Sequence, residues 1–580
     1  MGSLRLHVQF EALFEHYQGK ECHVQLEEIT EILFCTRRNA RIVLNKMEES
    51  GWIEWHPAPG RGKLSRLIFK RSRADVMDHL TRRYLDEGKI SQALRMLDNS
   101  PEKLAQVVQR YLGVQHQEGQ QVVRLPYYRP LSMLNPTQPM RRSEQHIARQ
   151  LFSGLTRLDD NEQLQPDLAH HWEAIHAQHW RFYLRPGVRF HDERPLTTAI
   201  VCHNIEQLRT TRLFRHIQQV SSPSKWVVDI QLSQPDYAFP RLLAEVRAKI
   251  VLPESERTGD VDRFPLGTGP YKVVQNDDKR LTLQAFDHYF GFRPLLDQVE
   301  VWVIDDVYSS MIFPSLTSSL KPEGRFGREN TQLSQKGERH EEVELDPGCT
   351  YLLLNRKSGL AADERWAHYF SQRLNALHLF QQMPPEQIVE LGVLPAYGLK
   401  PGWYHQAPPH SQVTPPDSCE VAIAYYERHP MFPLVAKRIE QSLKQDGLEV
   451  RLVPYSYAQP LVASDGIDLW IQPMGLANYR DDALAGWLLD YSEIEAVSQP
   501  EDFQAWSTLV DEWRAQQHAP FPARVLAQSL VEKKQIIPMF HCWLGVNKDH
   551  CGSLQNAQCN ALGWFDFSQV WVKPEIPLCE

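Results

Sequence analysis

Three short segments in the first 50 residues carry apolar residues at helical spacing. In each segment they fall at or close to positions i, i+3, i+4 and i+7, as on one buried face of a helix. They are Phe10, Leu13, Phe14 and Tyr17, then Leu26, Ile29, Ile32 and Leu33, and finally Ala40, Val43, Leu44 and Met47. This pattern predicts three short helices packed on one another at the start of the chain.

The third segment carries polar and cationic side chains opposite its apolar face. Thr36 is a suitable N-cap residue for a helix that begins there. The outward positions are Arg37, Arg38, Arg41 and Asn45. Guanidinium and amide groups bind phosphates and the base edges of a DNA major groove. We therefore predict that Thr36 and these four residues contact DNA from a helix-turn-helix.

A β-hairpin is predicted over about residues 52–70. Two strand-like runs there flank a stretch rich in proline and glycine. A hairpin that follows a helix-turn-helix is a wing, and basic residues at its tip reach the phosphate backbone or the minor groove. Arg61, Lys63 and Arg66 are the candidate DNA contacts of this wing.

The distribution of charge is consistent with an anionic partner. The chain has a net charge of −9, yet residues 36–73 contain ten Lys or Arg and three Asp or Glu. A basic stretch in an acidic protein suggests nucleic acid as the partner.

The alternative is a small helical bundle whose arginines only form a solvated surface. A phosphate-binding loop is rejected, because Leu64 stands where Ser or Thr would ligate magnesium.

The length of 580 residues predicts more than one domain. Residues 1–115 are expected to hold the winged helix with a helical extension, and the polar residues 116–121 are expected to form a linker. From residue 122 to residue 580, strands and helices alternate, which predicts an α/β domain.

Motifs in the second domain resemble those of family 5 extracellular solute-binding proteins, the oligopeptide-binding type. They are LFSGLTRL at 151–158, LQPDLAHHW at 164–172, WRFYLRPGVRFHD at 180–192 and GTGPY at 267–271. The resemblance implies a two-lobed α/β domain of the type II periplasmic-binding-protein class. The expected lobes are about 122–305 with 485–580, and about 306–484.

A winged helix joined to such a domain resembles the SgrR family of transcription regulators over essentially the whole chain. Further blocks similar to that family are LPYYRPL at 125–131, RRSEQHIARQ at 141–150, PAYGL at 395–399 and LGWFDF at 562–567. The resemblance implies a regulator that binds promoter DNA and senses a small cytoplasmic metabolite. It also implies a role in the sugar-phosphate stress response, with activation of a small regulatory RNA gene.

Residues 477–480 depart from the peptide-binding pattern. Peptide-binding relatives commonly carry Ala-Asp-Tyr, whose aspartate holds the α-amino group of the peptide, whereas this chain has Ala477, Asn478, Tyr479 and Arg480. A neutral amide beside an arginine favours an anionic or polyhydroxylated effector, such as a phosphorylated sugar. Asn478, Tyr479 and Arg480 are thus candidate ligand-binding residues, and the alternative is that they only line a loop.

Ligand-driven closure of the two lobes is expected to change the orientation or dimer spacing of the winged helices. A homodimer is a hypothesis at this stage. The competing hypothesis is a solute- or peptide-binding receptor of a transport system with no direct role on DNA.

No catalytic function is predicted. The chain has no Gly-x-Ser-x-Gly, His-Glu-x-x-His, Walker or dinucleotide motif, so we expect no catalytic residues and no cofactor. A metal site is not expected either, because the spacing of one His and Cys cluster fits no zinc pattern. That cluster is His541, Cys542, His550, Cys551 and Cys559.

A cytoplasmic location is expected. No stretch approaches the roughly 18 uncharged apolar residues of a membrane-spanning helix, and the first residues offer no apolar core for an export signal. The nine cysteines are scattered and odd in number, which suits reduced thiols better than disulfides.

Overall fold

The computed structural model of the chain divides into two compact units, Met1–Tyr111 and Leu112–Glu580, which are described separately. The structure describes all residues except 1, 61–62, 87–91, 94–112, 118, 160, 258, 304–340, 382, 385–392, 406–412, 430, 457–465, 491, 548–553 and 575–580. Arg61, the expected boundary between the lobes near residue 305, and His550 and Cys551 therefore lie outside the described residues.

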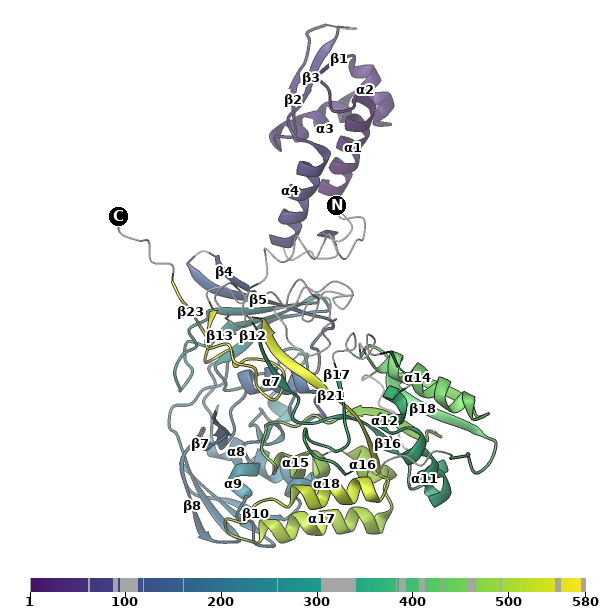
Figure 1. The fold of residues 1–580 in the computed structure, drawn as a ribbon. Coiled ribbons are helices and arrows are strands. Elements are labelled where there is room, and N and C mark those ends of the chain that lie inside the picture. The colour runs from purple at the N-terminus through teal and green to yellow at the C-terminus, as the bar shows by residue number, and fades with distance from the viewer. Residues whose placement is uncertain are drawn as a thin grey trace, which may run out of the picture. The chain divides into compact units, whose positions relative to one another are not determined.

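The smaller unit contains three helices and a three-stranded sheet, followed by a fourth helix (Figure 1). In chain order the elements are α1 (Gly2–Tyr17), β1 (Cys22–Val24), α2 (Leu26–Ile32), α3 (Arg37–Glu49), β2 (Ile53–His56), β3 (Ser65–Phe69) and α4 (Arg73–Asp86). The sheet has the order β1-β3-β2 and is antiparallel throughout. The predicted three helices and hairpin are confirmed, and β1 adds a strand that the sequence pattern did not predict.

Apolar side chains from all three of the first helices and from the hairpin form the core of this unit. The residues predicted to face inward on α3, which are Ala40, Val43, Leu44 and Met47, are all buried. Phe10 of α1 is fully buried, and its ring lies 5.5 Å from that of Trp52 in an edge-to-face arrangement. The hairpin is therefore fixed to the helices by aromatic packing.

The larger unit begins with two sheets. The first is five-stranded, in the order β12-β13-β14-β5-β4, and the second is four-stranded, in the order β10-β11-β9-β8. Their strands are β4 (Gly113–Gln117), β5 (Gln120–Tyr127), β8 (Ala169–His176), β9 (His179–Leu184), β10 (Ile217–Ser224), β11 (Val227–Leu232), β12 (Tyr271–Asn276), β13 (Arg280–Ala285) and β14 (Gln298–Val303). A short hairpin and three helices accompany them: β6 (Thr156–Leu158), β7 (Leu164–Pro166), α7 (Arg142–Leu151), α8 (Thr198–Gln207) and α9 (Phe239–Leu242).

A mixed seven-stranded sheet forms the second part of the larger unit. Its strands are β15 (Glu341–Leu345), β16 (Thr350–Leu354), β17 (Val393–Pro395), β18 (Glu420–Tyr426), β19 (Glu449–Tyr455), β20 (Leu469–Pro473) and β21 (Ile536–Asn547). Strand β18 pairs in parallel with β19 and β20, while the other pairs are antiparallel. The helices of this part are α11 (Glu364–Arg373), α12 (Ala376–Gln381), α14 (Phe432–Gln445), α15 (Ala483–Asp490), α16 (Ser492–Val497), α17 (Pro500–Arg514) and α18 (Ala523–Glu532).

The remaining elements are short. A two-stranded sheet is formed by β22 (Leu554–Gln555) and β23 (Trp571–Val572).

Helices α17 and α18 lie side by side (Figure 1), and Trp506 of α17 donates a hydrogen bond to Ser529 of α18 at 2.8 Å. Single turns of 3-10 helix occur at Leu208–Thr210, Arg212–Phe214, Val246–Ala248, Glu254–Glu256 and Leu360–Ala362.

Two predicted boundaries need correction. Residues 116–121 were expected to be a linker, but 116, 117 and 119–121 belong to the hairpin of β4 and β5, in which Gln117 pairs with Gln120. Gly119, with a φ of +82°, supplies the left-handed turn that this hairpin requires. The polar composition that suggested a linker belongs to a strand end at the edge of the sheet.

The second correction concerns the lobes. We expected residues 485–580 to join the first lobe, but β21 pairs with β15, β16 and β17 in the seven-stranded sheet. The chain then returns, and Trp564, Phe565 and Phe567 are buried against the five-stranded sheet and α7. The physical reason is that β21 supplies a continuous run of buried residues, 536–541, to one sheet, while the later aromatic residues fill the core of the other.

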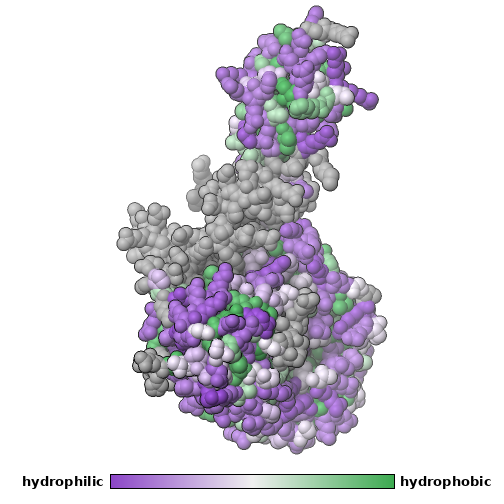
Figure 2. All heavy atoms as spheres, turned by 90° about the vertical axis from the view of Figure 1, so that its right-hand side faces the viewer, coloured by the Kyte–Doolittle hydropathy of each residue, from purple (hydrophilic) through white to green (hydrophobic). Residues whose placement is uncertain are grey.

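The described surface of the larger unit is mostly hydrophilic on the face seen in Figure 2, with hydrophobic side chains confined to patches. Within the described residues, the longest and most apolar helices fall short of what crossing a membrane requires.

Candidate DNA-binding face and effector cavity

Helix α3 begins at a capped turn that follows α2. The backbone of Thr36 is extended, and its hydroxyl accepts a hydrogen bond from the amide of Asn39 at 3.3 Å. This is the N-cap arrangement that the sequence predicted. Phe34, in the turn between α2 and α3, has a φ of +47° and a side chain that is 95% exposed.

The face of α3 opposite the core is exposed as predicted. Arg38, Arg41 and Asn45 are all exposed, and they recur at i, i+3 and i+7. Ile42 lies on the same face and is 45% exposed, although the sequence analysis did not select it. Its position, four residues after Arg38 and three before Asn45, is the sequence signal that places it on this face.

Two of the predicted DNA contacts are paired with carboxylates. Arg37 forms an ion pair with Glu27 of α2, and Arg66 of β3 forms one with Glu21 at 2.5 Å. The hydrogen bond from Arg66 lowers the pKa of the Glu21 carboxyl. Exposed ion pairs of this kind contribute little to stability. Both arginines can therefore exchange a carboxylate for a phosphate at low cost.

The wing holds the remaining candidate that the structure describes. Lys63 is exposed between β2 and β3, next to Leu64, whose side chain is 53% exposed. The candidates Thr36, Arg37, Arg38, Arg41 and Asn45 therefore lie on α3 or at its start, and Lys63 and Arg66 lie in the hairpin that follows. Arg61 is outside the described residues.

Replacing Thr36 by alanine is expected to lower the free energy of unfolding of the smaller unit by about 1 kcal/mol, because the amide of Asn39 loses its cap. Thr36→Ser keeps the hydroxyl and should retain most of that stability. Denaturant unfolding followed by circular dichroism measures the difference. Equal stability of the Ala and Ser variants would show that the cap contributes nothing.

The larger unit contains a cavity of about 660 Å³. Its lining comes from the start of α7, from strands of the seven-stranded sheet and from α15. Aromatic side chains form a large part of the wall: Tyr127, Tyr128, Tyr351, Tyr426, Tyr455, Trp470 and Trp487. A concave site of this size with a few polar groups is typical of small-molecule binding.

Three arginines in the sequence block 129–142 line this cavity. Arg129 is buried and forms a two-pronged ion pair with Glu144 of α7, in which its Nη2 lies 2.9 Å from Oε2. Arg141 donates to the hydroxyl of Tyr426 at 3.0 Å and lies 4.2 Å from the centre of that ring. Arg142 reaches Asp346 at 2.5 Å. These contacts hold the guanidinium groups in fixed positions on the wall.

His429 also lines the cavity but adds no positive charge at neutral pH. Burial, followed by the charges of Arg142, Arg129 and Arg141, lowers the pKa of its imidazole to about 3. The cationic character of this wall at neutral pH therefore comes from the arginines.

The predicted ligand residues Asn478, Tyr479 and Arg480 are brought together, but not on the cavity wall as the structure describes it. Ala477 before them and Ala483 after them line the cavity. The three residues form a polar turn in which Asn478 accepts from the amide of Arg480 at 3.0 Å. Arg480 also donates to the carbonyl oxygen of Glu162 at 3.2 Å. The side chain of Arg480 therefore joins this turn to the loop that contains Glu162.

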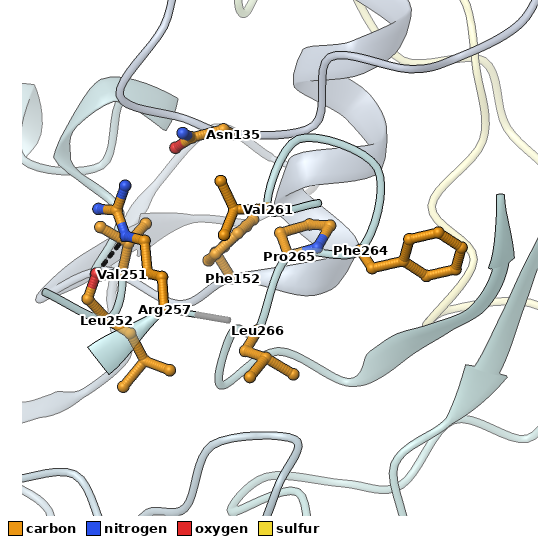
Figure 3. Close-up of a pocket in the computed structure, with 9 residues that line it drawn as sticks. All are labelled: Asn135, Phe152, Val251, Leu252, Arg257, Val261, Phe264, Pro265 and Leu266. Atoms are coloured by element: carbon orange, nitrogen blue, oxygen red, sulfur yellow. Dashed lines mark hydrogen bonds between the residues drawn. The ribbon is translucent and has the colours of Figure 1, made fainter. Parts of the chain in front are cut away.

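A second pocket, much smaller, lies beside the end of α7 (Figure 3). It has a volume of about 20 Å³, enough for about one water molecule. Most of its lining is apolar, and Arg257 donates to the carbonyl oxygen of Leu252 at 2.6 Å across it. The small volume makes it a packing defect rather than an effector site.

Comparisons with known proteins assign both parts. Residues 5–119 match the family described as "Sugar transport-related sRNA regulator N-term", and residues 163–317 match "Bacterial extracellular solute-binding proteins, family 5 Middle". The HTH-type transcriptional regulator SgrR of Yersinia pestis (strain Pestoides F) is 32% identical over 99% of this chain and 100% of its own length. The regulator of the same name from Shigella dysenteriae is 33% identical over 100% of both.

Solved structures show the fold of the larger unit. DppA from Helicobacter pylori, in complex with the peptide STSA, superposes with a TM-score of 0.63 at 15% identity, over 78% of this chain and 98% of its own. NikA from Brucella suis, in complex with Fe(III)-EDTA, gives a TM-score of 0.58 at 16% identity, over 78% of this chain and 100% of its own.

The two units together define a DNA-binding transcription regulator that carries a solute-binding domain of family 5. The chain belongs to the SgrR family of HTH-type transcriptional regulators. The alternative of a transport receptor without a role on DNA is not favoured.

Proposed function

We propose that α3 enters the major groove of promoter DNA with Arg38, Arg41, Ile42 and Asn45 toward the bases. The arginines and Asn45 have the donors for guanine and adenine edges, and Ile42 suits the methyl group of thymine. The observation that carries this proposal is the separation of one buried and one exposed face on a capped helix. Arg37, Arg66 and the basic tip of the wing contact phosphates and fix the register.

We further propose that the effector occupies the 660 Å³ cavity and that it is an anionic, polyhydroxylated molecule such as a phosphorylated sugar. Arg141 is the N-cap of α7, Arg142 is its first residue, and both line the cavity with Ser143. A helix N-terminus with two guanidinium groups is a suitable site for a phosphate. The aromatic wall offers flat apolar surfaces to the sugar ring.

In this proposal the protein acts by binding and not by catalysis, in the cytoplasm where the promoter lies. Two copies would place two α3 helices on successive major grooves of a pseudo-palindromic site. The effector can change the affinity of the protein for DNA only as far as the effector itself binds one state of the protein more tightly than the other.

Genome-wide capture of the DNA bound by this protein, with and without a sugar-phosphate load in the cells, tests the proposal. Enrichment of a few promoters that changes with the load supports it. Capture that is unaffected by the load would refute the effector assignment, and the absence of any enriched promoter would refute the DNA-binding role of α3.

Replacing Arg141 by alanine should weaken the binding of glucose 6-phosphate by about tenfold or more, because a charge-assisted hydrogen bond contributes about 1.5–3 kcal/mol. Arg365→Ala is the matched control, since Arg365 is exposed and pairs with Asp363 outside the cavity. Isothermal titration of the full chain gives both affinities. Equal losses in the two variants would argue against a phosphate at α7.

A further inference from the structure

Four acidic residues line the cavity in addition to the arginines: Asp346, which pairs with Arg142, Glu493, which is exposed, and Glu245 and Asp490. Glu245 follows α9, and Asp490 is the last residue of α15. Gly486, which also lines the cavity, lies one helical turn before Asp490 on the same face of α15. A Cβ atom placed on Gly486 would lie 3.7 Å from Cδ of Glu245. The carboxyl group of Glu245 therefore lies against the face of α15 that ends at Asp490.

Neither carboxyl group has a donor for its charge within the described part of the chain. Oδ1 of Asp490 is buried without a hydrogen-bond partner. The side chain of Glu245 takes part in none of the hydrogen bonds or ion pairs that the described residues make there. A largely buried carboxylate without a hydrogen-bond donor is unfavourable, because no hydrogen bond compensates its desolvation.

The charged groups that face Glu245 are mixed in sign. Burial raises the pKa of Glu245 to about 7; the charge of Arg149 opposes this, those of Asp490 and Asp482 add to it, and Lys249 opposes it. The carboxyl group is thus divided between its two protonation states near neutral pH.

Asp490 has a similar environment. Burial raises its pKa to about 6, against the charges of Arg247 and Arg514. The four cations near the two carboxyl groups all have other partners. These are the carbonyl oxygen of Ala477 for Arg149 (2.8 Å), Asp167 for Lys249 (3.6 Å), the carbonyl oxygen of Thr137 for Arg247 (2.7 Å) and the carbonyl oxygen of Leu213 for Arg514 (2.8 Å).

We propose that Glu245 and Asp490 form a subsite for a protonated amino group of the effector. An ammonium group has a positive charge and three donors, so it can bridge two carboxylates and compensate both. A hydroxyl group brings one donor and no charge. A bound metal ion is less well suited, because no group of three metal-ligating side chains occurs among the described residues.

This inference rests on the proposed function, since it places both groups in the same effector cavity. With an anion at the start of α7 and an ammonium group at Glu245 and Asp490, the effector becomes a dipolar molecule, of which a phosphorylated amino sugar is an example. The cation-binding carboxylate that is missing at Asn478 is then supplied by residues elsewhere on the cavity wall.

The subsite predicts a dependence of affinity on pH. In the empty cavity both carboxyl groups bind protons more readily than ordinary carboxyls do. A bound ammonium group lowers both pKa values, so binding releases protons. The affinity for an amine should therefore rise as the pH rises from about 5.5 to about 7.

Calorimetric titration of the full chain with glucosamine 6-phosphate, glucose 6-phosphate, glucosamine and glucose tests this subsite. We expect each amine to bind about tenfold or more tightly than its hydroxyl counterpart at pH 7, and this preference to shrink at pH 5.5. The two compounds in each comparison either both carry the phosphate or both lack it, so the contribution of the phosphate to affinity cancels. Glu245→Gln and Asp490→Asn should each reduce the preference to about threefold or less, while Glu501→Gln, at an exposed carboxylate outside the cavity, should keep it.

The two proposals fail in different ways. No preference for the amine in the unaltered protein, or no binding of either amine, would overturn the subsite whatever the variants do. A preference for the amine without any gain from the phosphate would keep the subsite and refute the phosphorylated-sugar assignment. If a variant does not fold, the subsite is tested by the unaltered chain alone, through its preference for each amine over the hydroxyl counterpart and the dependence of that preference on pH.

Discussion

Replacing Arg38 and Arg41 together by alanine is expected to weaken binding to the specific promoter by about 2–6 kcal/mol, a factor of about 30 or more. Each arginine that reads a base edge with two hydrogen bonds contributes about 1–3 kcal/mol of discrimination. Both side chains are exposed on α3, so their removal leaves the core of the smaller unit intact. Fluorescence anisotropy with the promoter and with unrelated duplex DNA, at one ionic strength, measures the effect.

Two controls separate base contacts from phosphate contacts. Lys63→Ala should weaken the binding of all sequences similarly and reduce the slope of log affinity against log salt by about 1. Arg73→Ala should have little effect, because Arg73 lies at the start of α4, where it pairs with Glu11 and Glu15 of α1, and not on α3 or in the wing. If the Arg38 and Arg41 variant binds promoter and unrelated DNA with unchanged affinities, α3 is not the element that reads the sequence.

Replacing Glu144 by alanine is expected to lower the free energy of unfolding of the larger unit by about 3–5 kcal/mol. Glu144 and Arg129 are both buried, and the substitution leaves the guanidinium group of Arg129 without its carboxylate. Denaturant unfolding of the full chain, followed by tryptophan fluorescence, measures the loss. The same substitution at Glu493, which is exposed on the cavity wall, should cost about 0.5 kcal/mol or less.

The ion pair also predicts sensitivity to acid. Burial alone would raise the pKa of Glu144, but the charge of Arg129 and its hydrogen bonds hold that pKa below the ordinary value. The stability from this pair is therefore present above the ordinary Glu pKa of about 4.3 and is lost as the pH falls through the lowered pKa. Replacing Arg129 and Glu144 together by apolar residues should restore much of the stability and remove this dependence. A double variant as unstable as Glu144→Ala would contradict this account.

The described helices and hairpin of the smaller unit could be predicted because their structure follows from local patterns. The spacing of Ala40, Val43, Leu44 and Met47 identified the buried face of α3, and Thr36 identified its start. Strand β1 was missed, since three residues of mixed burial carry no periodic pattern. The hairpin of β4 and β5 was predicted to be a linker, because polar residues are as typical of a sheet edge as they are of a loop.

The cavity could be predicted only in outline. The family resemblance placed it in the second domain, but its polar wall joins Arg141, Glu245 and Asp490, which are far apart in the sequence. No local spacing relates such residues, because they meet only when the sheets and helices pack. The candidates Asn478 to Arg480 came from a motif comparison, and their neighbours line the cavity instead.

The most direct test of the central claim is selection of binding sites from random duplex DNA by the full chain and by its Arg38→Ala variant. The exposed face of α3 is predicted to select a defined motif, and the variant is predicted to lose discrimination at one base pair and keep it at the others. Recovery of the same motif with the same strength by both proteins, or of no motif by the unaltered chain, would contradict the account.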